Sequence, residues 1–199
     1  MTIKDGPFAS PRVRSAAIVV AAVVLVMVGT ILTRTSPYAR YENDAGGWSA
    51  EYPTAWHVHD WINPGSAAFI SYDAITADFQ KAIPFTVGPA PVPDGDLRIE
   101  VELWDNPDRV DAMTWVERQL AAPPHFAAGV TDRGARTVAR TTAATYTQVA
   151  SMAYPVTVVQ RRVFLPSADR RHMLELKAYP ASSVRIVEFE HLLETFTLR

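Results

Sequence analysis

Residues 156–165 read VTVVQRRVFL and residues 171–179 read RHMLELKAY, and these two stretches decide the fold. Each has the length and the apolar content of a β-strand, and the residues between them, PSADR, are typical of a turn. The pair predicts a long β-hairpin, and hence an antiparallel sheet on which the rest of the chain packs.

A strand upstream of the hairpin indicates how such a sheet faces its core. Residues 97–104 (LRIEVELW) alternate between apolar and polar side chains. With a period of two, the apolar set faces the core and the polar set, from Arg98 to Trp104, faces solvent. Further strands are predicted at 48–52, 56–61, 67–72, 129–133, 135–140 and 143–150.

Two helices accompany these strands. The first takes Asn106 as its N-cap and runs to about Ala121, where two prolines stop it. The second takes Ser182 or Ser183 as its cap, and a short extended tail follows at 195–198. Strands and helices segregated in this way predict the α+β class, with an antiparallel sheet and helices packed on its faces.

The first fifth of the chain does not read as globular sequence. Residues 16–32 (AAIVVAAVVLVMVGTIL) carry no charge, and with Ser15 and Thr33 they can cross about 30 Å of hydrocarbon as a helix. A cleaved signal peptide is the alternative, but this apolar core is long for one and no good cleavage site follows it. We predict a cytoplasmic N-terminus, a transmembrane signal-anchor helix, a juxtamembrane tether and an extracytoplasmic domain at 1–14, 15–33, 34–45 and 46–199.

Basic residues set the orientation of the predicted membrane helix. Lys4, Arg12 and Arg14 precede it, so the N-terminus stays in the cytoplasm and the single-pass protein carries its domain outside. The chain has no cysteine, which excludes disulfides, a lipid-modified cysteine and thiolate chemistry. Export of a domain without disulfides favours a bacterial membrane protein.

Several short motifs carry a family resemblance that covers residues 46–199. An early strand closes on EYPTAW (51–56), and the strand at 97–104 precedes a helix that carries a tryptophan. ATY (144–146) follows, and after the long hairpin the last helix leads into FTL (196–198). This order resembles the PsbP-like family, whose fold is an α/β/α sandwich. The resemblance implies a non-enzymatic accessory or scaffold role, often at a membrane.

His57 and His59 form the one pair of side chains that suggests a metal. On a strand both imidazoles point to the same face, as two ligands of a zinc site do. A third ligand has to come from elsewhere, and His125 and His172 are the remaining central histidines. The alternative is two half-exposed histidines on an edge strand.

Tryptophan residues suggest a binding surface or an apolar pocket. Trp61 and Trp104 fall on the outer faces of their predicted strands, so they are the candidates for contact with a ligand or the membrane interface. Packing between sheet and helix is the alternative for any single tryptophan. A small apolar ligand would lie between the sheet and the proline-rich segment 73–96.

Four arginines of the hairpin are the candidates for recognising an anionic group. Arg161 and Arg162 lie on its first strand, and Arg170 and Arg171 lie at its turn, so we expect them near one another. They would recognise anionic lipid headgroups or an acidic partner. The alternative is a solvated strand face, or pairing with Glu100 and Glu102.

The sequence contains none of the motifs that define common enzyme or cofactor sites. No glycine-rich nucleotide loop and no G-x-S-x-G elbow is present, so we name no catalytic residue and expect no cofactor. Arginines are not interleaved with aromatics, which argues against nucleic acid. We expect a binding or accessory module docking on a protein or cell-envelope component, with a His57 and His59 hydrolase or an apolar ligand carrier as alternatives.

Overall fold

The computed structural model describes residues 36–60, 63–72, 92–122, 129–151 and 157–199. The chain divides into two compact units, Met1–Ser36 and Pro37–Arg199, and nearly all described residues belong to the second. Among them no helix has the length and apolar character needed to cross a membrane. The predicted membrane helix at 15–33 lies outside the described residues.

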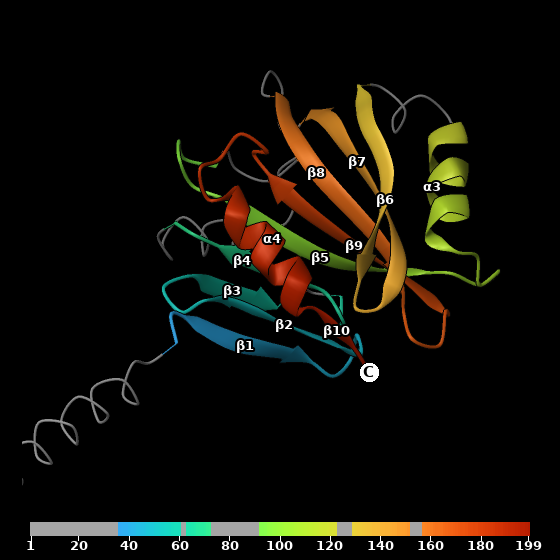
Figure 1. Cartoon of the computed structure of the whole chain (residues 1–199), viewed down its shortest axis with the longest axis horizontal. Coiled ribbons are helices and arrows are strands. Elements are labelled where there is room, and N and C mark those ends of the chain that lie inside the picture. The colour runs from blue at the N-terminus through green and yellow to red at the C-terminus, as the bar shows by residue number, and fades with distance from the viewer. Residues whose placement is uncertain (1–35, 61–62, 73–91, 123–128, 152–156) are drawn as a thin grey trace, which may run out of the picture. The chain divides into compact units, whose positions relative to one another are not determined.

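A seven-stranded antiparallel sheet, the large sheet, forms the centre of the domain (Figure 1). The predicted hairpin is confirmed and lies in the middle of this sheet: Arg161 pairs with Ala178, and Pro166 pairs with Met173 beside the turn. In spatial order the strands are β3 (His57–Asp60), β4 (Ala67–Ile70), β5 (Arg98–Asp105), β9 (His172–Tyr179), β8 (Thr157–Pro166), β7 (Thr141–Ser151) and β6 (Val130–Val138). The two pieces predicted at 129–140 are one strand, β6, with a bulge between Thr131 and Gly134.

A small sheet of three strands joins the two ends of the domain. It consists of β1 (Tyr38–Asn43), β2 (Trp48–Pro53) and β10 (Thr197–Leu198), with β2 in the middle. The backbone N–H of Arg199 extends the pairing by donating to Gly47 O at 2.8 Å. The prediction of a tether at 34–45 is therefore wrong for residues 38–43, which form β1, and the domain begins at Pro37.

Two helices, α3 (Ala112–Ala121) and α4 (Ile186–Thr195), complete the described part of the domain. The side chain of Asp111 caps α3 by accepting from the N–H of Thr114, so the prediction of Asn106 as the cap is wrong. Asp111 satisfies a free N–H of the first helical turn as well as an asparagine would. The N-cap of α4 is Arg185 and has no side-chain hydrogen bond, so the prediction of Ser182 or Ser183 as the cap is wrong; Ser183 Oγ instead accepts from the N–H of Arg185 in the preceding turn.

The main core lies between the large sheet and a layer made of α4 and the small sheet (Figure 1). Trp48 is fully buried there, its ring stacked on Phe196 at 5.4 Å and its indole N–H donating to Gly65 O. On the opposite face α3 packs on β7 and β8, with Ala112 and Val116 as its buried residues. The predicted α+β class, with helices on both faces of an antiparallel sheet, is confirmed for the described residues.

The strands run between two ends of the domain, which we call proximal and distal. The proximal end holds Tyr38, where the domain begins, and the hydroxyl of Tyr38 donates to Glu188 in the first turn of α4 at 2.9 Å. Strand β9 ends at the same side with Tyr179, just before α4. The distal end holds Asp105 and His172, which pair at the other ends of β5 and β9. Eight residues of β9 separate the two ends by roughly 23 Å.

Candidate functional site

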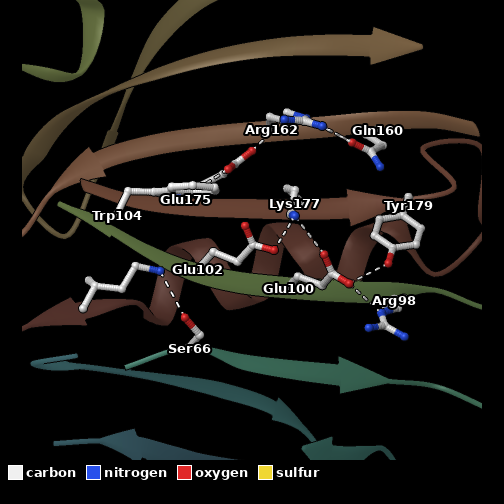
Figure 2. A network of polar contacts seen from close by, with 11 residues as sticks. Ser66, Arg98, Glu100, Glu102, Trp104, Gln160, Arg162, Glu175, Lys177 and Tyr179 are labelled. Carbon is white, nitrogen blue, oxygen red and sulfur yellow. Dashed lines mark hydrogen bonds and ion pairs between the residues drawn. The ribbon is translucent and has the colours of Figure 1, made fainter. Parts of the chain in front are cut away.

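A layer of charged side chains lies on the face of the large sheet opposite α4 (Figure 2). One oxygen of Glu100 accepts hydrogen bonds from Arg98 Nε at 2.8 Å and from the Tyr179 hydroxyl at 2.6 Å. Its second oxygen lies 3.0 Å from Lys177 Nζ, which also donates to Glu102 at 2.6 Å. Arg98 and Glu100 are each only 4% exposed, so this cluster is a buried ion network.

The layer continues across β9 to β8 in a second group of contacts. Arg162 donates to Glu175 at 2.8 Å, and two of its other nitrogens donate to Gln160 at 3.0 and 2.6 Å. Glu175 also accepts the indole N–H of Trp104 at 3.0 Å. Each of the three carboxylates of the layer therefore has a cationic partner.

The pKa values of the layer follow from burial and from these pairings. Burial alone would raise the pKa of Glu100, but the charges of Lys177 and Arg98 outweigh it and lower the pKa to about 2. Burial raises the pKa of Glu102, and Lys177 offsets only part of that effect. Burial and the neighbouring Glu100 raise the pKa of the Tyr179 phenol well above its ordinary value. Three cations, Arg98, Arg162 and Lys177, pair with three carboxylates in the layer, which suits a structural brace better than a reactive centre.

This charged layer bears on the expectation of a small apolar ligand beside segment 73–96. Residues 73–91 of that segment lie outside the described part of the chain. The sheet face carries the ion pairs of β5 and β9, and an apolar molecule on it would cover charges without making hydrogen bonds to them. The described face of the sheet is thus suited to polar contacts rather than to an apolar ligand.

His57 and His59 lie on β3 and share a face, as predicted from their spacing. Within the described ranges no group of three histidine, cysteine, aspartate or glutamate side chains comes together to hold a metal. His172 is on β9, with two strands between it and β3, and lies at the distal end, whereas His57 pairs with Ile70 near the proximal end. His125 lies outside the described residues. The described part of the chain supplies no third ligand to the pair.

The structure describes one of the two tryptophans predicted as surface residues. Trp104 is 46% exposed at the distal end of β5, in agreement with its predicted outward position, and it hydrogen-bonds to Glu175. Trp61 lies outside the described residues. Trp48 and Trp56 are buried in the core, so the packing alternative holds for both.

The four hairpin arginines do not form one cluster, which corrects the expectation that they lie near one another. Arg161 points to the α4 side and donates to Glu190 at 2.8 Å, whereas Arg162 points to the opposite face and is part of the charged layer. Successive residues of a strand face opposite sides, so adjacent arginines on β8 cannot act together. Arg170 and Arg171 lie at the distal turn and are exposed.

Arg171 lines an open depression of about 500 Å³ at the distal end. The turn after β5 and the turn before β9 form its walls, which are made by Asp105, Asn106, Pro107, Arg109, Arg171 and His172. We call this depression the distal pocket. Asp105 lies 3.7 Å from the His172 ring and Asp169 lies 3.8 Å from Arg171. The lining itself carries two arginines, Arg109 and Arg171, against one carboxylate, Asp105, so its charge is positive by one.

Asn106 holds the two turns of the distal pocket together. It is 1% exposed, and its amide donates to Val110 O and to Arg170 O at 3.0 Å each. Its backbone N–H donates to Arg171 O at 2.7 Å. Arg109 and Arg170 have φ angles of 51° and 59°, a left-handed conformation that is unfavourable for residues other than glycine. Strained residues fixed by a buried clamp at a depression are typical of a binding site.

Sequence reasoning identified Arg170 and Arg171 but missed Arg109 and the clamp. Arg109 follows β5 and Arg171 precedes β9, and only the pairing of Asp105 with His172 brings them together. The predicted turn at Asn106 and Pro107 was a local signal for this loop. Asn106 was interpreted as a helix cap, whereas in the structure its side chain links the turn after β5 to the turn before β9.

Comparisons with known proteins bear on the fold. No protein-family model and no curated protein matches the sequence. The solution structure of cyanobacterial PsbP (CyanoP) from Synechocystis sp. PCC 6803 superposes with a TM-score of 0.51 at 12% identity, over 84% of this chain and 95% of that chain.

Two other solved structures are similar at a lower level. A crystal structure from Bacteroides thetaiotaomicron VPI-5482 has a TM-score of 0.47 at 12% identity, over 82% of this chain and 49% of that chain. The Saccharomyces cerevisiae Ran-binding protein Mog1p has a TM-score of 0.46 at 11% identity, over 81% and 95%. At these levels neither carries an argument. The likeness to cyanobacterial PsbP shows that the domain has the PsbP-like fold implied by the resemblance of the sequence.

Proposed function

We propose that this chain is a membrane-anchored, extracytoplasmic accessory module of non-enzymatic character, whose distal pocket docks on an acidic stretch of a cell-envelope protein. The distal pocket is the observation that carries the proposal. It combines an open cavity, an excess of arginine and a rigid frame fixed by Asn106. The uncharged sequence at 16–32 and the basic residues before it support the anchor.

The position of the distal pocket fits docking to a protein better than binding to the anchoring membrane. The chain enters the domain at Tyr38, at the proximal end, and the pocket lies roughly 23 Å away along β9. At that distance the arginines lie beyond the reach of the anionic headgroups beside the anchor, since surface charge is screened within about 10 Å. They remain available to a protein in the space outside the membrane.

Carboxylates are the groups that this pocket is suited to bind. Arginine presents planar, fixed donors that match a carboxylate in a bidentate pair. Among the described residues Arg109 has no carboxylate partner, and Arg171 has only the exposed contact with Asp169 at 3.8 Å, so a ligand at Arg109 displaces no ion pair.

Charge reversal at the distal pocket should abolish the docking. We expect Arg109→Glu and Arg171→Glu each to lower photo-crosslinking to a membrane partner on the order of tenfold, and the double variant to remove it. The probe is a benzophenone attached to a cysteine at Pro107 in the full-length protein, which has no other cysteine. Recovered adducts are identified by mass spectrometry after crosslinking in native membranes.

The matched control is Arg133→Glu, which reverses an exposed arginine on β6, away from the pocket. It should leave the yield unchanged, and raising the salt concentration should lower the yield of the wild type. An equal loss with Arg133→Glu would show that only net charge matters. A failure to obtain any adduct at Pro107 that depends on Arg109 or Arg171 would refute the proposed docking site.

A further inference from the structure

Four of the exposed large hydrophobic side chains of the described residues gather at the proximal end. Val184 and Val187 are 81% and 63% exposed, and Val149 and Val159 are 47% and 40% exposed. Solvent-exposed single valines are ordinary, but a group of them on one surface is typical of a contact site. We call these four residues the valine patch.

The valine patch combines the start of α4 with the neighbouring ends of β7 and β8. Val149 and Val159 are directly paired across these strands, and the N–H of Ala181 donates to Val159 O at 2.8 Å just before α4. Further along, Arg161 donates to Glu190 at 2.8 Å. Val159 precedes Arg161 by two residues, and Val187 precedes Glu190 by one helical turn. Both valines therefore lie closer to the proximal end than this ion pair does.

The polypeptide enters the domain beside the valine patch. The hydroxyl of Tyr38 donates to Glu188, the neighbour of Val187, and the Tyr38 ring stacks on His191 at 3.8 Å between centroids. The carbonyl of Pro37 accepts from the N–H of Thr54 at 2.9 Å. The first residues of the domain are therefore fixed against α4, so they add no free length between the preceding chain and the valine patch.

The length of chain before Tyr38 determines what can cover the valine patch. Only residues 34–37 separate the predicted membrane helix from β1, and four extended residues span at most about 14 Å. A domain tied so closely has its proximal end at the headgroup layer. Arg185, half-exposed between Val184 and Val187, lies 3.6 Å from Asp96, so the apolar side chains and not a net charge mark this surface.

We infer that the proximal end of the domain rests on the lipid bilayer, with Val184 and Val187 inserted at the boundary between headgroups and acyl chains. Side chains at such an interface lie about 5–10 Å deep. The inference rests on the anchor of the proposed function, because the short connection positions the patch. It also fixes the orientation of the domain, with the distal pocket facing away from the membrane.

Quenching of a fluorophore by lipid-bound spin labels tests the orientation. The full-length protein has no cysteine, so a bimane can be attached at Val24→Cys in the predicted span, Val187→Cys in the patch or Ala168→Cys at the distal turn. Each variant is reconstituted in two sets of vesicles of phosphatidylcholine and phosphatidylglycerol, one containing a shallow doxyl lipid for position 187 and one a deep doxyl lipid for position 24. Val187 and Ala168 are both exposed, so neither substitution disturbs the core.

We expect the labels at positions 24 and 187 to lose most of their fluorescence and the label at position 168 to keep it. Quenching at 24 without quenching at 187 would overturn the inference while leaving the anchor intact. An absence of quenching at 24 and 187 would reject both the anchor and the inference. Quenching at 187 alone would support lipid contact by the patch and reject the membrane helix.

Discussion

Replacing Lys177 with methionine should lower the free energy of unfolding by about 3–5 kcal/mol at pH 7, the usual cost of leaving a buried charge without its partner. Lys177 contacts Glu100 at 3.0 Å and Glu102 at 2.6 Å, and its side chain is 14% exposed. Methionine fills similar space, so the loss reports the charge rather than a cavity. The measurement is urea unfolding of the full-length protein in mild detergent, followed by tryptophan fluorescence.

The pH dependence separates the charge effect from packing. The pKa of Glu100 is lowered from 4.5 to about 2, so its contribution to stability is present above pH 4.5 and is lost as the pH falls toward 2. Glu102, whose pKa is raised, gains stability on protonation and offsets part of that loss. In Lys177→Met both carboxyls lose their ammonium partner, so the difference between variant and wild type should shrink as the pH falls from 6 to 3.

The control for Lys177→Met is the triple variant that also carries Glu100→Gln and Glu102→Gln. Neutral amides no longer require the ammonium group, so this variant should regain part of the lost stability. A difference from the wild type that stays constant down to pH 3 would mean that packing, and not charge, explains the loss.

Replacing Asn106 with alanine should cost about 2–4 kcal/mol, because it leaves several buried backbone groups without partners. The lost contacts are those of the side chain with Val110 and Arg170. The same variant should lower crosslinking through the distal pocket, since it removes the side-chain contacts between the two turns and leaves the backbone bond from residue 106 to Arg171 O. Thermal unfolding and the benzophenone assay measure the two effects.

Asp111→Ala provides the comparison for Asn106→Ala. Asp111 caps α3 through Thr114, and loss of a helix cap costs about 1 kcal/mol without touching the pocket. Asn106→Ala should therefore be the more damaging of the two and the only one that reduces crosslinking. An equal cost for both variants, with crosslinking retained, would contradict the role of Asn106 as a clamp.

The elements with strong local signals were predictable from the sequence. The apolar strands around 166–170 formed the hairpin in the middle of the large sheet, and the alternation of residues 97–104 matched β5 within a residue. The terminal helix and the extended FTL tail also formed. In each case period and turn chemistry act within a few residues, so they are visible without tertiary contacts.

The burial of Arg98 and Glu100 could not be predicted in that way. An alternating strand indicates which side chains share a face, but not whether the polar face meets solvent. Here the charges are satisfied by Lys177 and Tyr179, which lie far along the chain on β9. Only the register of β5 against β9 brings these side chains together, and no local pattern encodes that register.

The distal pocket and the first strand were missed for related reasons. Residues 38–43 read YARYEN, which is polar and follows a proline, and they become β1 only because β2 pairs with them. Arg109 sits in a turn whose left-handed backbone would ordinarily favour glycine, so the sequence offers no reason to place it at a binding surface.

The position of β10 imposes an order of events on biogenesis. Strands β1 and β2 are synthesised first, yet β2 lacks its second neighbour, and Trp48 lacks the stacked ring of Phe196, until the last strand arrives. With the export proposed above, the small sheet would close only after residue 198 has crossed the membrane, and earlier intermediates would expose an unpaired edge to chaperones and proteases. In pulse-chase labelling, protease resistance of the first hairpin should appear only once residues 197–198 are translocated, and resistance in a chain arrested before them would contradict this order.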